Sequence, residues 1–217
     1  MIADKQTYLR SLVIELTKTW PQNRFINLVF HGHSVPAGYF LTPYVNSYGS
    51  YPYILHKKLK ERFPFAIINP IVTAIGGENS VQGAKRFDSD VLCHKPDLLT
   101  IDYGLNDRYV DINACVLAWQ EMIEKALAKN IPVILLTPTL DNSYYKQDAN
   151  WELLSKHREQ IKKLADIYNV GLVDSFQVFL DYINNGGALE DLLSQSNHPS
   201  EKGHALVAQE LYRYFPI

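Results

Sequence analysis

The sequence has few cysteines, no long apolar run and no long block of charge of one sign. Its two cysteines, Cys93 and Cys115, are too few for a disulfide framework and fit no metal-binding spacing, so we expect reduced, structural thiols. The 21 basic and 23 acidic side chains are interspersed and give a formal net charge of −2. That balance argues against a protein that binds nucleic acid or an acidic membrane surface.

The N-terminal segment contains neither the hydrophobic core of a secretory signal nor a membrane span, because polar residues interrupt its only apolar stretch. The chain as given is therefore expected to be cytoplasmic, and an exported mature form that has lost its signal stays open. Without repeats or low-complexity linkers, residues 1–217 are expected to form a single domain, with 1–25 as a helical extension packed on it. No pattern in the sequence indicates an oligomeric state.

Short apolar runs alternate with segments of helical spacing along the rest of the chain. The predicted strands are 26–32, 65–74, 97–104, 131–139 and 170–176, and the predicted helices are 4–20, 48–63, 80–94, 111–129, 150–168 and 199–214. Strands that are apolar on both faces and alternate with helices are typical of a parallel sheet covered on both sides. We therefore expect a three-layer α/β/α domain, with its ligand site beyond the carboxyl ends of the strands.

The first predicted strand ends in the turn Gly32-His33-Ser34, which would lift the serine hydroxyl to the edge of the sheet. Pro36 and Gly38 indicate that a loop, and not a helix, follows the serine directly. An ordinary turn serine is the alternative interpretation, since such turns are common.

Two more polar turns follow the second and third predicted strands. Gly77 in "AIGGENS" could offer a bare backbone N–H to an oxyanion, and Asn106 in "YGLND" could direct its side-chain N–H₂ into the same crevice. Asp107 could order that loop through hydrogen bonds to its backbone. Each turn alone is also compatible with a plain connection, but three polar turns would meet in one crevice.

Near the C-terminus, His198 precedes Pro199 and lies at the entrance of the last predicted helix, which makes it the better general base. His204 lies on that helix and is expected to pack or to hydrogen-bond. A zinc site built from His31, His33, His198 and His204 is disfavoured, because His31 and His33 would face opposite ways and no further ligand accompanies them. We expect neither a metal nor another cofactor.

Together these motifs resemble the SGNH hydrolases, also called the GDSL esterase/lipase family, whose four blocks carry Ser, Gly, Asn and His in that order. The corresponding residues are Ser34 in "GHS", Gly77 in "IGGENS", Asn106 in "GLND" and His198 in "NHPSEKGH", and the resemblance covers residues 26 to about 212. It implies a flavodoxin-like fold with a five-stranded parallel sheet. It also implies that Ser34 attacks an ester carbonyl and His198 accepts the proton, while the N–H of Ser34, the N–H of Gly77 and the Asn106 side chain hold the oxyanion.

The chain departs from the family pattern at two positions. His33 replaces the aspartate of the "GDS" motif, so we count His33, together with Asp107, as a candidate for the substrate pocket. Gln195 replaces the aspartate of Asp-x-x-His and cannot supply its charge. Three alternatives stay open: a backbone carbonyl or Gln195 orients His198, Asp191 loops in to do so, or the protein is a weak or inactive relative.

The expected function is serine-dependent hydrolysis of short acyl esters through an acyl-enzyme, with a carbohydrate O-acetyl group as one candidate substrate. The alternatives are a lysophospholipase or thioesterase of the same family, or a catalytically weak binding protein on the same fold. The segment after Ser34 carries Tyr39, Phe40, Tyr44, Tyr48, Tyr51 and Tyr53, and Tyr144 and Tyr145 follow later. Such rings suit either a sugar or amphipathic loop packing. The expected partner is a small-molecule ester, with no nucleic acid and no membrane.

Overall fold

The computed structural model describes residues 1–216, and its centre is a five-stranded parallel sheet. The strands are β1 (Phe25–Gly32), β2 (Ile67–Val72), β3 (Leu98–Asp102), β4 (Val133–Leu136) and β5 (Gly171–Val173). Their order across the sheet is β2-β1-β3-β4-β5, so the chain reverses its direction of travel between β1 and β3. In open α/β sheets the crevice at such a reversal is where ligands bind, and this one lies beyond Gly32 and Asp102.

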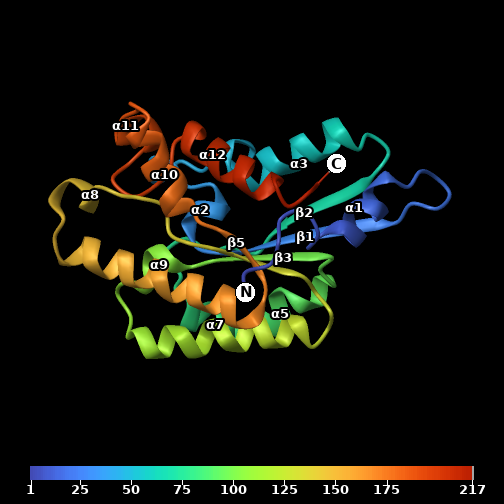
Figure 1. Ribbon diagram of the computed structural model, residues 1–217, viewed down its shortest axis with the longest axis horizontal. Coiled ribbons are helices and arrows are strands. Elements are labelled where there is room, and N and C mark those ends of the chain that lie inside the picture. Colours follow the sequence, from blue (N-terminus) through green and yellow to red (C-terminus); the bar gives the residue numbers. More distant parts are fainter. Residues whose placement is uncertain (217) are drawn as a thin grey trace.

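Helices cover both faces of the sheet, which confirms the predicted three-layer architecture (Figure 1). One layer contains α3 (Tyr51–Arg62), α10 (Ser175–Asn184) and α12 (Glu201–Tyr212), and the other contains α4 (Ser80–Lys85), α5 (Phe87–Asp90), α7 (Ile112–Leu127) and α9 (Ala149–Tyr168). The side chains of successive residues of β1 point to opposite faces of the sheet, because Cβ atoms alternate across a strand. Phe30 packs in the core under α3 and α12, and Val29 packs in the core under α7 and α9.

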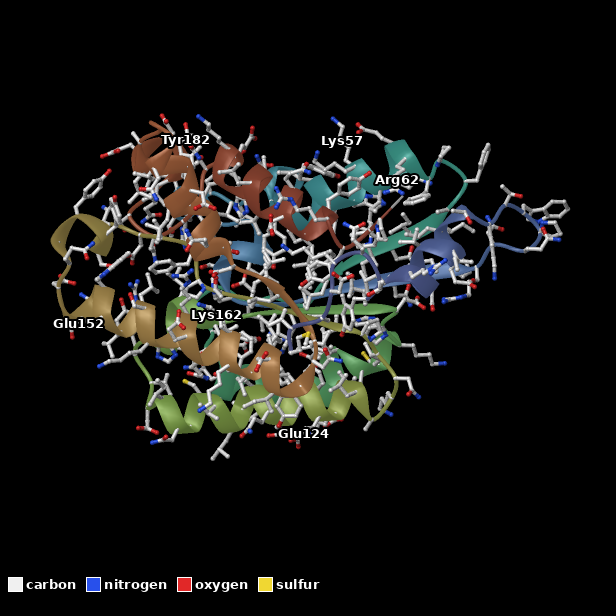
Figure 2. All side chains as sticks on the ribbon, in the orientation of Figure 1. Lys57, Arg62, Glu124, Glu152, Lys162 and Tyr182 are labelled. Atoms are coloured by element: carbon white, nitrogen blue, oxygen red, sulfur yellow. The ribbon has the colours of Figure 1, made fainter. Side chains whose placement is uncertain are left out.

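The N-terminal helix α1 (Arg10–Thr17) buries Leu12 and Leu16, which join the core that Phe30 shares. It begins later than the predicted start at residue 4, because the segment before it forms turns on the carbonyl of Asp4. None of the helices within residues 1–216 combines the length and the apolar character that a membrane span requires. Figure 2 shows polar side chains on the outer surfaces of both layers, including Lys57 and Arg62 on α3 and Glu124 on α7.

Short elements occupy the loops around the sheet: α2 (Ser34–Ala37), η1 (Ser47–Gly49), η2 (Leu92–His94), α6 (Gly104–Asp107), α8 (Ser143–Lys146) and α11 (Leu189–Leu192). Two further differences from the sequence-based predictions concern helices. The helix predicted over 80–94 is broken into α4, α5 and η2, and α10 was not predicted. Helix α10 starts where Asp174 caps it by accepting the N–H of Gln177 at 3.2 Å.

Candidate active site

The turn at the end of β1 places Ser34 at the first position of a helix. Gly32 is required there, since a Cβ on it would lie 2.4 Å from the carbonyl oxygen of Asp102 on the neighbouring strand. The prediction of an intervening loop was wrong, because α2 starts directly at Ser34. Pro36 is compatible with this short helix, whose first turn needs no intrahelical N–H donors. His33 caps the helix by accepting the Val35 N–H on its Nδ1 at 3.1 Å.

Ser34 and His198 lie within hydrogen-bonding distance although 164 residues separate them. The serine Oγ is 3.0 Å from Nε2 of the imidazole, and the two side chains are 6% and 7% exposed. The loop that carries His198 is held by the N–H of Ser194, which donates to the His198 carbonyl at 2.9 Å, and by a bridge between Leu193 and Pro199. Two buried groups on different loops thus form a candidate nucleophile and base.

The other nitrogen of His198 defines which proton the ring carries. Nδ1 lies 2.9 Å from the backbone carbonyl oxygen of Phe40, and a carbonyl can only accept a hydrogen bond. Nδ1 therefore carries the proton, and the lone pair on Nε2 faces the Ser34 hydroxyl. This is the tautomer that a general base at this position needs.

Burial lowers the pKa of His198 below its usual 6.5, and the positive charge that His33 would carry if protonated adds to this effect, while the bond to Phe40 opposes it. Because the neutral form is favoured, the ring is ready to accept a proton at neutral pH.

Gln195 and Asp191 are not the partners of His198. The Gln195 Oε1 accepts the backbone N–H of Thr42 at 2.9 Å, which fastens the segment that contains Phe40. Asp191 is exposed and accepts the Tyr182 hydroxyl at 2.7 Å and the Ala188 N–H at 3.3 Å. Asp191 is thus engaged in capping α11, and a backbone carbonyl occupies the position at which the family has a carboxylate. Of the three alternatives drawn from the sequence, the geometry fits the backbone carbonyl.

The candidate oxyanion donors lie on the loops after β1, β2 and β3. Within residues 1–216 the backbone N–H groups of Ser34 and Gly77 have no hydrogen-bond partner, and Gly77 adopts a φ of +80° that favours glycine. The Asn106 amide donates one N–H to the carbonyl oxygen of Glu78 at 2.9 Å. A carboxamide has two N–H groups, so Asn106 keeps a second donor for a ligand.

A buried polar network supports the loop that carries Gly77. The Glu78 carboxylate, 8% exposed, accepts the Tyr103 hydroxyl at 2.7 Å and Nε of Arg86 at 2.7 Å. The Tyr103 hydroxyl is also 3.1 Å from Nε2 of His31. The loop after β2, which carries Gly77 and Glu78, is therefore connected through Tyr103 to the end of β3 and to His31 on β1.

His33 and Asp107, the two candidates for the substrate pocket, are both buried. Asp107 is fully covered and accepts the Ser80 N–H at 2.8 Å and the Trp119 indole N–H at 2.7 Å, so it fastens α4 and α7. The His33 ring is 1% exposed, and its Nε2 lies 3.4 Å from Asp102. Both side chains face the interior, where they hold the loops and do not line a surface.

His204 and His157 are also buried and pack inside the protein. His204 accepts the Tyr51 N–H at 3.3 Å and packs against the Phe40 ring at 5.0 Å, as expected for a packing histidine. Over residues 1–216, Asp107, Cys115 and His157 form the only group of three or more side chains spaced to hold a metal. The Asp107 carboxylate already accepts two N–H groups there, and burial raises the pKa of the Cys115 thiol to about 12.

The aromatic residues after Ser34 divide into packing and exposed groups. Tyr51 is fully buried, and Phe40 packs on His204, whereas Tyr44 and Tyr48 are exposed. Tyr39 is different, because a Cβ on Gly76 would lie 2.9 Å from its ring, and its ring centroid is 6.1 Å from that of His198. Tyr39 therefore borders the candidate site between the oxyanion loop and the base.

Comparison with known proteins identifies one family. The model of the GDSL-like lipase/acylhydrolase family matches residues 30–206, which include Ser34, Gly77, Asn106 and His198. No curated protein sequence matches the chain.

Among solved structures, Axe2, an acetylxylan esterase from Geobacillus stearothermophilus, is 21% identical with a TM-score of 0.75, and the alignment covers 88% of this chain and 94% of Axe2. A lipase/acylhydrolase from Enterococcus faecalis is also 21% identical, with a TM-score of 0.74 and coverage of 87% and 94%. Identities this low show a shared fold. The family match over most of the chain shows more: this protein is a member of the GDSL-like lipase/acylhydrolase family and a carboxylic ester hydrolase.

Proposed function

We propose that the protein hydrolyses short acyl esters through an acyl-enzyme on Ser34, with His198 as general base and acid. The observation that supports this most strongly is the contact of 3.0 Å between Ser34 Oγ and His198 Nε2, with Nδ1 bound to the Phe40 carbonyl. A serine hydroxyl is a weak nucleophile unless a neighbouring base takes its proton. His198 has the tautomer and the lowered pKa for that task.

In the first half-reaction, Ser34 Oγ attacks the ester carbonyl carbon and its proton passes to His198 Nε2. The negative charge on the carbonyl oxygen is held by the N–H groups of Ser34 and Gly77 and by the Asn106 amide, each such donor being worth about 10²- to 10³-fold in rate. Collapse of this intermediate breaks the ester C–O bond, and His198 returns the proton to the leaving alcohol. Water then attacks the acyl-enzyme with the same base, which releases the acid and restores Ser34.

The backbone carbonyl of Phe40 orients the His198 ring in place of the family's carboxylate, but it does not supply the carboxylate's negative charge. In serine proteases, replacing the carboxylate by an amide costs about 10⁴-fold, largely because the imidazole then adopts the wrong tautomer. A carbonyl oxygen enforces the correct tautomer, so we expect a smaller loss here. Stabilisation of the imidazolium is the part that a neutral carbonyl supplies less well than a carboxylate.

An acetyl ester on a carbohydrate is the substrate class we favour. The neighbour Axe2 is an acetylxylan esterase, and in this chain the pocket that includes Asn197, the residue before His198, is lined by polar residues, among them Asn142 and Asn150. An apolar groove lies between α7 and α9 and includes no residue of the candidate site. The surroundings of Ser34 therefore suit a small acyl group with a polar alcohol better than a long hydrocarbon chain.

The test is a series of p-nitrophenyl esters with acyl chains from acetyl to dodecanoyl, together with the Ser34→Ala variant. We expect the highest kcat/KM for acetate, a loss of turnover in Ser34→Ala, and no change in Ser89→Ala, an exposed serine on α5. Mass spectrometry after a fluorophosphonate reagent should find the adduct on Ser34. A maximum at eight or more carbons would indicate the lysophospholipase or thioesterase alternative, and no turnover or labelling would indicate a binding protein.

A further inference from the structure

A polar pocket of about 220 Å³ is lined by residues that neighbour two candidate site residues in the chain. Arg108 and Tyr109 follow Asn106 in the chain, and Asn197 precedes His198. The third wall comes from the loop after β4, which contains Asn142 and α8 and extends to the far left in Figure 1, and from Asn150 in the first turn of α9. The backbone N–H of Asn142 donates to the Ser196 carbonyl at 2.9 Å, so this loop is attached to the one that carries His198.

The charges at the base of this pocket neutralise each other. Arg108 and Asp141, 7% and 5% exposed, form a buried ion pair, and the other Asp141 oxygen accepts the Ser143 N–H at 2.9 Å. Asp148 is engaged as the cap of α9, where it accepts the Asn150 N–H at 3.0 Å. Lys146 is the one further cation among the residues that line the pocket. The two cations and two carboxylates of the lining balance, so the pocket offers a charged ligand no net attraction and suits a neutral one.

One wall of the pocket is an exposed aromatic ring. The side chain of Tyr109 is 71% exposed, and the Arg108 guanidinium carbon lies 5.0 Å from its ring centroid. Arg108 is itself paired with Asp141, so this cation–π contact favours one orientation of the ring. An aromatic ring with an open face can bind the C–H face of a sugar ring, and a favoured orientation lowers the entropic cost.

Three carboxamides line the same pocket: Asn142, Asn150 and Asn197. Within residues 1–216 their side chains make no hydrogen bond to the protein. Each amide offers two N–H donors and an accepting oxygen, which match sugar hydroxyls because these both donate and accept. An alkyl chain in the same place would cover these groups without bonding them, and that is unfavourable.

The volume of the pocket also favours a small sugar over a long alkyl chain. Pockets for drug-sized ligands measure roughly 300 to 1,000 Å³, so a pocket of about 220 Å³ suits one small group such as a single ring. We propose that this pocket, which we call the Tyr109 pocket, binds the hydroxylated alcohol part of the ester, a sugar ring resting on Tyr109 with its hydroxyls on the three asparagine amides. The inference rests on the proposed function, because it supplies the alcohol side of that reaction.

Kinetics on two acetyl esters tests the proposal: an acetylated methyl xyloside, which has the sugar, and p-nitrophenyl acetate, which lacks it. For Tyr109→Ala we expect kcat/KM on the xyloside to fall about tenfold, mainly through KM, and to change less than twofold on p-nitrophenyl acetate. Tyr109→Phe keeps the ring and should stay near wild type on both esters. Tyr48→Ala, at an exposed tyrosine on η1, is the matched control and should change neither rate.

Direct binding of unacetylated methyl xyloside, measured by NMR titration of wild type and Tyr109→Ala, separates this inference from the proposed function. Weaker binding in the variant supports the pocket even if no ester is hydrolysed. Equal binding by the two proteins overturns it, as does an equal loss on both esters in the kinetic test. A selective loss on p-nitrophenyl octanoate would also overturn it, because the pocket would then hold the acyl chain.

Discussion

The imidazole of His198 donates its Nδ1 proton to the carbonyl oxygen of Phe40 over 2.9 Å. That oxygen belongs to a short hairpin, in which the Phe40 N–H donates to the Tyr44 carbonyl at 3.1 Å and Tyr39 bridges to Val45. The base of the proposed reaction is therefore oriented by the shape of a loop.

The first prediction concerns the acid limb of the pH–rate profile. Since burial lowers the pKa of His198, the neutral ring persists below pH 6.5, and kcat/KM for p-nitrophenyl acetate should fall to half its plateau at a pH below 6.5. The control is His94→Gln, which changes an exposed histidine and should leave the profile unaltered. A midpoint clearly above 6.5 would contradict this account of the base.

Restoring the family aspartate should not restore a triad. In Gln195→Asp the shorter side chain loses the bond to the Thr42 N–H, and the Phe40 carbonyl already occupies Nδ1 of His198. We therefore expect kcat for p-nitrophenyl acetate to fall severalfold, as in Gln195→Ala, because the hairpin loosens. A rise of kcat by tenfold or more in Gln195→Asp would show instead that a carboxylate at position 195 reaches the ring.

Glu78 is expected to act on the rate through the oxyanion loop. Glu78→Gln weakens the bonds to Tyr103 and Arg86, and the carbonyl of the same residue positions Asn106. We expect kcat to fall about tenfold with little change in KM, less than the 10²- to 10³-fold loss on removal of an oxyanion donor. Asp90→Asn is the matched control, since Asp90 also pairs with Arg86 but from a side chain that is 44% exposed. Equal effects of the two variants would count against a role for Glu78 in positioning.

Buried histidines should make the fold sensitive to mild acid. Burial lowers the pKa of His31 to about 4 and that of His204 to about 3, whereas both take up protons near pH 6.5 in the unfolded chain. Their contribution to stability is present above pH 6.5 and is lost as the pH falls toward 4 and 3. At pH 5 the loss is about 2 kcal/mol for each.

Urea unfolding at pH 7 and pH 5 measures this loss. In His204→Gln, whose side-chain oxygen can still accept the Tyr51 N–H, the difference between the two pH values should shrink by about 2 kcal/mol. The pH dependence of wild type and variant would be the same if His204 titrated normally in the folded protein.

Local patterns predicted most of the fold, because apolar strands and helical spacing are local properties. The five strands were predicted within a few residues of their bounds, and the order Ser, Gly, Asn, His placed Ser34, Gly77, Asn106 and His198 on loops that meet at one crevice. The short helix α2 was not predicted, since Pro36 and Gly38 read as loop residues. Proline is tolerated in a first helical turn, and Gly38 ends the helix with a φ of +87°.

Tertiary contacts account for what the sequence could not indicate. Asp107 follows Asn106 and seemed to belong to the pocket, but the Trp119 indole and the Ser80 N–H, from other elements, draw it inward. The Phe40 carbonyl gives no signal in the sequence, because every residue has one and only the hairpin decides where it points. Tyr109 drew no attention either, since its exposure and its contact with Arg108 arise from folding.

That the acceptor on His198 is a main-chain atom has a consequence for how this site responds to mutation. No single substitution can delete it, because residue 40 keeps its carbonyl whatever side chain it carries. An alanine scan of the kind that exposes the aspartate of a triad would pass over position 40 without a signal attributable to the acceptor. Replacing the Phe40–Leu41 peptide bond by an ester would weaken the carbonyl as an acceptor, and semisynthesis could thus reach a contact that codon changes leave intact.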